Sequence, residues 1–333
     1  MSTTKLESVN QLLSLYQQGE RNFTEVSLEL ANFNQANLNQ INLKKARLGR
    51  GKFIEVKLIS ANLSEADLVE ANLSKSLLIE SNLAKTNLSK AQLTLADLSG
   101  ANLSNAILTS ADLSEACLIG TSMISCNLAY ANLQSANLTS AVLAKAILAE
   151  AQLTQANLTR AILTEANLRG ASLSKARLIR TYLTRVNLRG ANLTGCDLSL
   201  ADLRHADLRE ANLRGASLVG ANLSDANLTN ANLHKANLEG AELARANLRN
   251  ARLSYANLRG SNLLKADLSE ANLAQANLTQ AGLLLCYLTG ANLAYANLDE
   301  ANLIGVNLRG ANFLATSVEN TILPNGTKTQ GKM

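Results

Sequence analysis

The sequence predicts an all-β solenoid, a chain wound into stacked coils around a core of leucine. The first observation behind this is a five-residue period. A large apolar residue, which we call the centre of its unit, recurs at every fifth position from Phe23 to Leu323, giving 61 centres without a slip in register. All but six centres are leucine, and the residue two positions earlier is alanine in 43 of the 61 units.

The second observation is that this period suits extended chain and not a helix. At about 100° per residue, successive centres would spread around a helix and form no apolar face. Side chains two positions apart on extended chain share a face. In a unit such as Ala221–Asp225, alanine and leucine therefore point inward, while the other residues face outward or turn a corner.

These units, Ala-(Asn/Asp)-Leu-x-x, resemble the motif of the pentapeptide repeat family over about residues 21–325. The resemblance implies a right-handed quadrilateral β-helix with four units per coil, hence about 15 coils. The charges support the four-unit coil independently, because Glu25, Lys45, Glu65 and Lys85 alternate in sign at a spacing of 20. Such long regular arrays are similar to bacterial, especially cyanobacterial, members of the family.

We expect three segments: an N-terminal capping helix in residues 1–20, the β-helix in 21–325 and a flexible polar tail in 326–333. A solenoid exposes its core at each end unless something covers it. Thr4 and Glu7 fit a capping box, an apolar stripe runs from Leu6 to Tyr16, and Gly19 is placed to end the helix. The alternative is a helix that binds a membrane surface or a partner.

Two surfaces are candidates for binding. The first is a basic column, spaced so that its members stack on the coils, which consists of Arg169, Arg189, Arg209, Arg249 and Arg309. It would suit a phosphate or an acidic partner, although Asp202, Asp207 and Glu210 lie close enough to neutralise part of it.

The second surface is an apolar patch near the C-terminus, formed by Leu264, Leu284, Leu285 and Ile304. No second helix is expected to cover that end of the core. Some members of the resembled family dimerise through their C-terminal ends, so a homodimer is an expectation here; the alternative is a patch without a role.

Composition and motifs argue against an enzyme. His205 and His234 fall at outward positions on different columns, and neither neighbours an outward nucleophile in a recognisable constellation. The four cysteines are too far apart on the coils to pair, so we expect no disulfide, no zinc site and no cofactor. No apolar run is long enough to cross a membrane, and the N-terminus shows no secretory leader, so we expect no membrane insertion and a cytoplasmic location.

The function expected from this is a non-enzymatic structural or interaction protein, a rigid rod whose outward side chains bind a protein partner. Some relatives mimic duplex DNA and bind DNA gyrase, but those have strongly acidic surfaces, whereas this chain carries a net charge of +5. Direct nucleic-acid or phosphate binding through the arginine column is a further alternative. We do not favour nucleic acid, because no aromatic residues interleave with the arginines to stack on bases.

Overall fold

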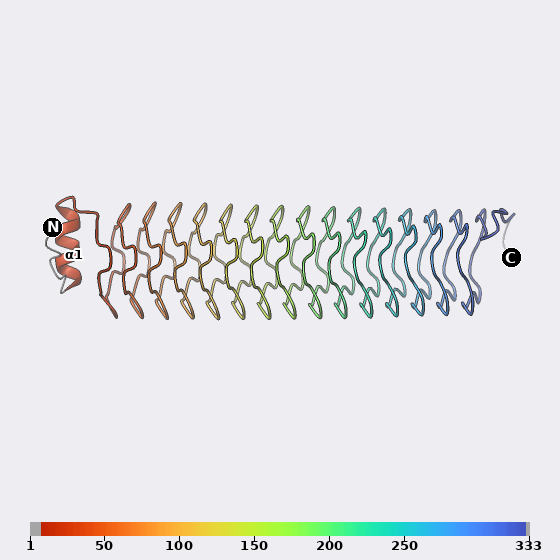
Figure 1. Cartoon of the computed structure of the whole chain (residues 1–333), viewed down its shortest axis with the longest axis horizontal. Helices are drawn as coiled ribbons and strands as arrows, with labels where there is room; N and C mark the ends of the chain where they lie inside the picture. Colours follow the sequence, from red (N-terminus) through yellow and green to blue (C-terminus); the bar gives the residue numbers. More distant parts are fainter. Residues whose placement is uncertain (1–7, 331–333) are drawn as a thin grey trace. The chain divides into compact units, whose positions relative to one another are not determined.

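The structure is a computed structural model that describes residues 8–330. The chain divides into two compact units, unit 1 (Met1–Ile162) and unit 2 (Leu163–Met333). Within the described residues the regular elements are one helix, α1 (Val9–Gln17), and a series of single-residue β-bridges. In each unit the chain winds in successive coils, and α1 lies beside the first coil of unit 1 (Figure 1).

The bridges fix the register of the coils. Each parallel bridge joins residues 20 apart, as in Asn42↔Asn62 of unit 1 and Asn212↔Asn232 of unit 2, so four five-residue units complete one coil. The N–H of Asn62 donates to Ile41 O of one neighbouring coil (2.8 Å), and the N–H of Leu63 donates to Asn82 O of the other (2.7 Å). This confirms the predicted stacking at a spacing of 20. Because the chain turns after every side, the pairing stays at isolated bridges instead of growing into long strands.

A tight turn closes each corner. In the unit that contains Leu63, the carbonyl of Leu63 accepts the N–H of Ala66 (3.1 Å), and Glu65 at the corner has a φ of 61°. Most corner residues are not glycine, although the left-handed conformation costs such residues about 1–2 kcal/mol. The asparagine before the centre supports the turn, since Asn62 Oδ1 accepts the N–H of Ser64 (3.1 Å). This explains why the sequence prefers Asn or Asp there.

The centres form the core. Every centre from Phe23 to Leu303 is buried, with at most 7% of its surface exposed. Near the N-terminus, aromatic centres replace leucine, and the rings of Phe33 and Phe53 stack with centroids 5.1 Å apart. Gly51 stands where alanine usually does, and a Cβ there would lie 2.6 Å from Phe53 Cε2. The missing methyl group makes room for the larger ring.

Helix α1 covers the N-terminal end of the core in unit 1. Ser8 is its N-cap and accepts the N–H of Gln11 (3.2 Å), whereas Thr4 and Glu7 of the expected capping box lie outside the described residues. Leu12 is fully buried, and the Tyr16 hydroxyl donates to Asn39 O (2.9 Å). The helix is therefore fastened to the first coil by both apolar and polar contacts.

The C-terminal segment differs from the expected flexible tail. Ile322 pairs with Lys328 in an antiparallel bridge, and the N–H of Thr329 donates to Thr321 O (2.9 Å). The Thr329 side chain is buried and also donates to Val318 O. Residues 326–330 thus fold back on one side of the last coil.

Candidate functional site

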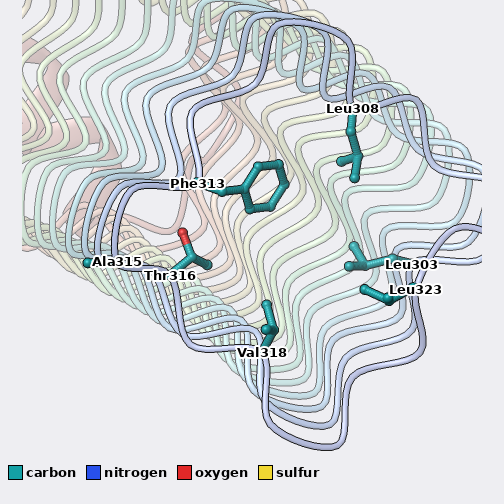
Figure 2. A pocket seen from close by; sticks show the side chains of 7 residues that line it. All are labelled: Leu303, Leu308, Phe313, Ala315, Thr316, Val318 and Leu323. Carbon is teal, nitrogen blue, oxygen red and sulfur yellow. The ribbon is translucent and has the colours of Figure 1, made fainter. Parts of the chain in front are cut away.

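An apolar concavity lies at the open C-terminal end of unit 2. Its volume is about 350 Å³, and Figure 2 shows its lining side chains around the end of the core. The lining consists of Leu303, Leu308, Phe313, Ala315, Thr316, Val318 and Leu323. Four of these, Leu308, Phe313, Val318 and Leu323, are centres that are half-buried, unlike all earlier centres. The returning segment 326–330 pairs with the side that contains Ile322, and among the described residues no segment pairs with the other three sides of that coil from beyond it.

The predicted apolar patch runs up to this end. Bridges Asn262↔Gly282 and Gly282↔Asn302 place Leu264, Leu284 and Ile304 on successive coils of one side, as the spacing predicted. Leu264 and Leu284 are half-buried, whereas Leu285 and Ile304 are 43% and 38% exposed. The exposed part of the patch therefore lies on the coils that contain Leu285 and Ile304, and Ile304 directly follows Leu303 of the concavity.

The predicted arginine column also stacks. The N–H of Gly170 donates to Arg189 O (3.0 Å), and the N–H of Gly190 donates to Arg209 O (2.9 Å), so Arg169, Arg189 and Arg209 occupy consecutive coils. Arg249 and Arg309 lie further along the same side, through the bridges that link positions 207 to 307 in steps of 20.

Carboxylates neutralise the middle of this column. Arg209 holds Asp207 with two hydrogen bonds (2.8 and 2.5 Å), and Arg189 contacts Glu210 (2.9 Å). Arg249 contacts Asp267 (3.2 Å). Among the described residues, no carboxylate pairs with Arg169 or Arg309. The column is therefore a series of ion pairs with an unpaired arginine at each end.

The paired carboxyl groups are held in their charged form. Hydrogen bonds from Arg209 keep the pKa of Asp207 below its ordinary value, against the opposing effect of partial burial. Hydrogen bonds from Arg204 lower the pKa of Asp202 in the same way. These groups therefore act as fixed charges near neutral pH and are poor proton donors.

The cysteines offer no reactive thiol in the core. All four are free, and Cys126, Cys196 and Cys286 are buried in the small inward position. Burial raises the pKa of each of these three thiols to about 12. They therefore stay protonated and pack as small apolar side chains.

Two other kinds of site are absent from the described residues. In residues 8–330, no group of three or more His, Cys, Asp and Glu side chains is arranged to hold a metal ion. No helix in the same range has the length and apolar character needed to cross a membrane.

The sequence predicts the arginine column and the apolar patch but not the concavity at the C-terminal end of unit 2. A signal was present, because the last three centres, Phe313, Val318 and Leu323, include two departures from leucine. The sequence predicts that nearby carboxylates neutralise part of the arginine column but not which residues pair. The 20-residue spacing fixes the backbone positions, whereas the ion pairs depend on side-chain conformers.

Comparison with known proteins identifies the family. Eight copies of the pentapeptide repeat model match the chain, and they cover residues 22–58, 61–100, 86–123, 121–160, 161–199, 206–243, 241–280 and 286–323. The chain belongs to the pentapeptide repeat family, which confirms the resemblance in its sequence, and this family forms right-handed β-helices. Its members are in general non-enzymatic, and membership supports a repeat protein involved in protein interaction. A search of curated proteins found no match.

Solved structures of other family members are similar to the chain. HetL, from the cyanobacterium Nostoc sp. strain PCC 7120 and involved in the regulation of heterocyst differentiation, is 30% identical, with 97% of this chain and 100% of that chain covered and a TM-score of 0.34. Rfr23, from the cyanobacterium Cyanothece 51142, is 28% identical over 43% of this chain and 90% of that one, with a TM-score of 0.17. QnrB1, a plasmid-mediated fluoroquinolone resistance protein, is 19% identical over 52% and 84%, with a TM-score of 0.36.

Proposed function

We propose that this chain is a non-enzymatic interaction protein that pairs with a second copy of itself through the open C-terminal end and binds a protein partner with its outward side chains. The observation that carries the proposal is the apolar surface at the end of unit 2, where Leu308, Phe313, Val318 and Leu323 are half-buried. In this proposal the β-helix has about 15 coils and serves as a rigid support, with no catalytic role.

Self-association would cover the apolar side chains and the backbone groups that the last coil of unit 2 leaves exposed. The end of the core exposes apolar side chains as well as backbone groups that have no further coil to pair with, and both are costly to leave in water. The adjoining patch, with Leu285 and Ile304 exposed, enlarges this surface. A second copy presents the same surface, so a two-fold arrangement would bury both at once.

Light scattering on purified protein tests the homodimer. We expect a mass of twice the protomer's 35.4 kDa for the native chain and a lower mass for Leu285→Lys. Leu200→Lys is a matched control, because Leu200 is also an exposed corner leucine of unit 2 with a φ of 60°, against 59° for Leu285. A monomeric native protein, or an equal loss of mass in both variants, would contradict the proposed pairing.

For the protein partner, we propose an acidic surface that contacts the arginine column at Arg169 and Arg309. These two side chains are exposed or nearly so and are not engaged by carboxylates in the described residues. Affinity capture with the native chain should recover a partner that Arg169→Glu and Arg309→Glu together release. Arg259→Glu, which changes an exposed arginine on another side, should still capture it. An unchanged set of proteins with the double variant would dismiss this column.

We do not propose DNA mimicry or nucleic-acid binding through the arginine column. The net charge of +5 opposes mimicry of a polyanion, and carboxylates occupy three of the five arginines. A gyrase supercoiling assay and a gel shift on duplex DNA at several salt concentrations should both show no effect. We also propose a cytoplasmic location, which fits the free state of all four cysteines.

A further inference from the structure

A shallow polar pocket of about 290 Å³ lies on a different side of unit 2 from the arginine column. It extends over four successive coils, whose units on this side are residues 211–215, 231–235, 251–255 and 271–275. It is lined by Arg214, Asn232, His234, Arg252, Ser254 and Asn272. The lining contains three basic side chains and no carboxylate, and it belongs neither to the C-terminal apolar surface nor to the arginine column.

The pocket exists because Arg252 interrupts a column of asparagines. Elsewhere in this column the side chains bond to one another: Asn232 Nδ2 donates to Asn212 Oδ1 (3.2 Å), and Asn292 Nδ2 donates to Asn272 Oδ1 (3.4 Å). Arginine has no acceptor to offer at this position. In the described part of the chain, the Nδ2 group of Asn272 consequently finds no acceptor.

The same substitution frees a backbone donor. In a regular unit the asparagine before the centre accepts the N–H two residues later, as Asn232 does for His234 (3.2 Å). With arginine at position 252, the N–H of Ser254 has no acceptor among the described residues. The pocket therefore combines two guanidinium groups with an amide donor and a backbone donor, all without partners.

The charges around the pocket leave it positive. Arg214 and Arg252 form no ion pair in residues 8–330, unlike Arg204, which is bound by a carboxylate of its own unit. Two acidic residues lie on the neighbouring corner, but both turn elsewhere. Glu210 is held by Arg189 (2.9 Å), and the Glu270 carboxylate lies against Gly290, which is on the next coil.

His234 is fixed in the middle of the pocket. Its Nδ1 atom bonds to Ser254 Oγ (2.8 Å), and its ring meets the Tyr255 ring edge-on, with centroids 5.5 Å apart. Lys235 lies on the same rim, with Nζ 5.9 Å from the Tyr255 ring centroid. The imidazole is thus held in place between the two arginines, and its Nε2 atom has no partner in the described residues.

We propose that this pocket binds a phosphate group, either as free phosphate or as a phosphomonoester of a small molecule. Arg214 and Arg252 both line the pocket and stand two coils apart, about 10 Å along the stack, so that two long side chains can contact one bound group. A guanidinium binds phosphate oxygens in pairs, and phosphate accepts from several donors at once, which matches a pocket rich in free donors and lacking carboxylates. The volume exceeds that of a single phosphate and leaves space for an attached organic group.

Proton NMR of the histidine rings tests this directly, because the chain has only two histidines, His205 and His234. Inorganic phosphate, added at fixed pH and at constant ionic strength held with sodium chloride, should shift the His234 signals with saturation. The His205 signals, assigned with a His205→Gln variant, should not change with them. Glycerol 3-phosphate should give the same shift, at lower concentration if the natural ligand is a phosphomonoester.

Arg252→Asn is the decisive variant, since it restores the residue that the repeat uses at this position and should fold normally. It removes one guanidinium and supplies an acceptor to Asn272 and Ser254, so we expect phosphate affinity to fall by about tenfold or more. Arg259→Asn makes the same change of charge on another side and should bind as the native chain does. The proposal is overturned if phosphate gives no saturable shift beyond that of chloride, or if the two variants weaken binding equally.

Discussion

The N-terminal end of unit 1 and the C-terminal end of unit 2 differ in how their cores are closed. In the first coil of unit 1, Phe23 and Leu38 are buried; α1 lies beside that coil (Figure 1), and Leu12 of the helix is fully buried as well. In the last coil of unit 2, Leu308 and Phe313 remain half-buried, because only the short returning segment pairs with that coil. The repeat itself is nearly the same in both places. The difference shows that the repeat alone does not complete a core, and that the segments flanking it decide which end is available for contact.

The largest effect should come from a matched pair of leucines on one side of unit 2. Leu288 is fully buried, and Leu308 lies one coil later and is half-buried. Leu288→Ala should reduce the free energy of unfolding by about 2–5 kcal/mol because it leaves a cavity. Leu308→Ala should cost about 1 kcal/mol, because solvent or a partner already contacts that side chain. Urea unfolding of both variants measures this, and equal losses would show that the last coil is as well packed as its neighbour.

At the N-terminal end of unit 1, α1 should be held on the first coil mainly by Leu12. Leu12→Ala should detach α1, because Leu12 is the fully buried residue of the helix. We expect the free energy that holds the helix on the first coil to fall by about 2–5 kcal/mol. Hydrogen exchange should then accelerate in the coil that contains Phe23 and Phe33, while exchange in unit 2 stays unchanged. Gln17→Ala, on an exposed position of the same helix, is the control. Slow exchange in the first coil of the Leu12 variant would mean that the helix contributes little to closure.

A smaller loss is expected from the aromatic packing near the same end. Gly51→Ala would place a methyl group 2.6 Å from the Phe53 ring and 2.9 Å from Leu48 O, so we expect a cost of about 1–3 kcal/mol. Gly49→Ala provides the control, since its new Cβ would meet only Val69 O at 3.6 Å and should change stability by less than about 0.5 kcal/mol. Thermal unfolding distinguishes them, and a neutral Gly51→Ala would mean that the ring moves without cost.

The smallest effect is a pH dependence confined to unit 2. Folding lowers the pKa of Asp202 and Asp207 through hydrogen bonds from Arg204 and Arg209, so their stabilising contribution is present above the ordinary value of 3.8 and is lost as the pH falls through the lowered values. A variant with asparagine at both positions should have a slightly lower Tm than the native chain at neutral pH. The difference should shrink as the pH falls below 3.8 and disappear once the pH is below the lowered pKa values of both carboxyl groups. A difference that persists in acid would assign it to packing instead of charge.

Much of this fold could be predicted from the sequence because the five-residue period continues without interruption from Phe23 to Leu323. The burial of the centres and the stacking of Arg169, Arg189 and Arg209 at a spacing of 20 depend only on that period, and the bridges confirm the spacing. Features outside that period were not predictable in the same way. The pairing of Thr329 with Thr321 lies beyond the last repeat. Arg209 binds Asp207 of its own unit, whereas Arg249 binds Asp267 of the next coil. This difference depends on side-chain conformers, which the five-residue period does not determine.

The polar pocket around His234 could be predicted from the sequence only in part. The sequence shows arginine where its column otherwise has asparagine at 212, 232, 272 and 292. That substitution could have been noticed without a structure. Its consequence could not, because it takes the hydrogen-bond network to show that Asn272 and Ser254 lose their acceptors when Arg252 intervenes.

Because the chain turns a corner in every five-residue unit, the outward side chains of the β-helix could be rearranged during evolution by gain or loss of single units. Each unit turns the chain onto the next side, so four units return it to the side where it began. Gain or loss of one unit between Arg209 and Arg249 would leave the buried leucines in phase but move Arg249 and every later residue to an adjacent side. A single five-residue duplication would thus rotate the downstream pattern of charges by a quarter turn, and binding surfaces could be recombined while the core is conserved.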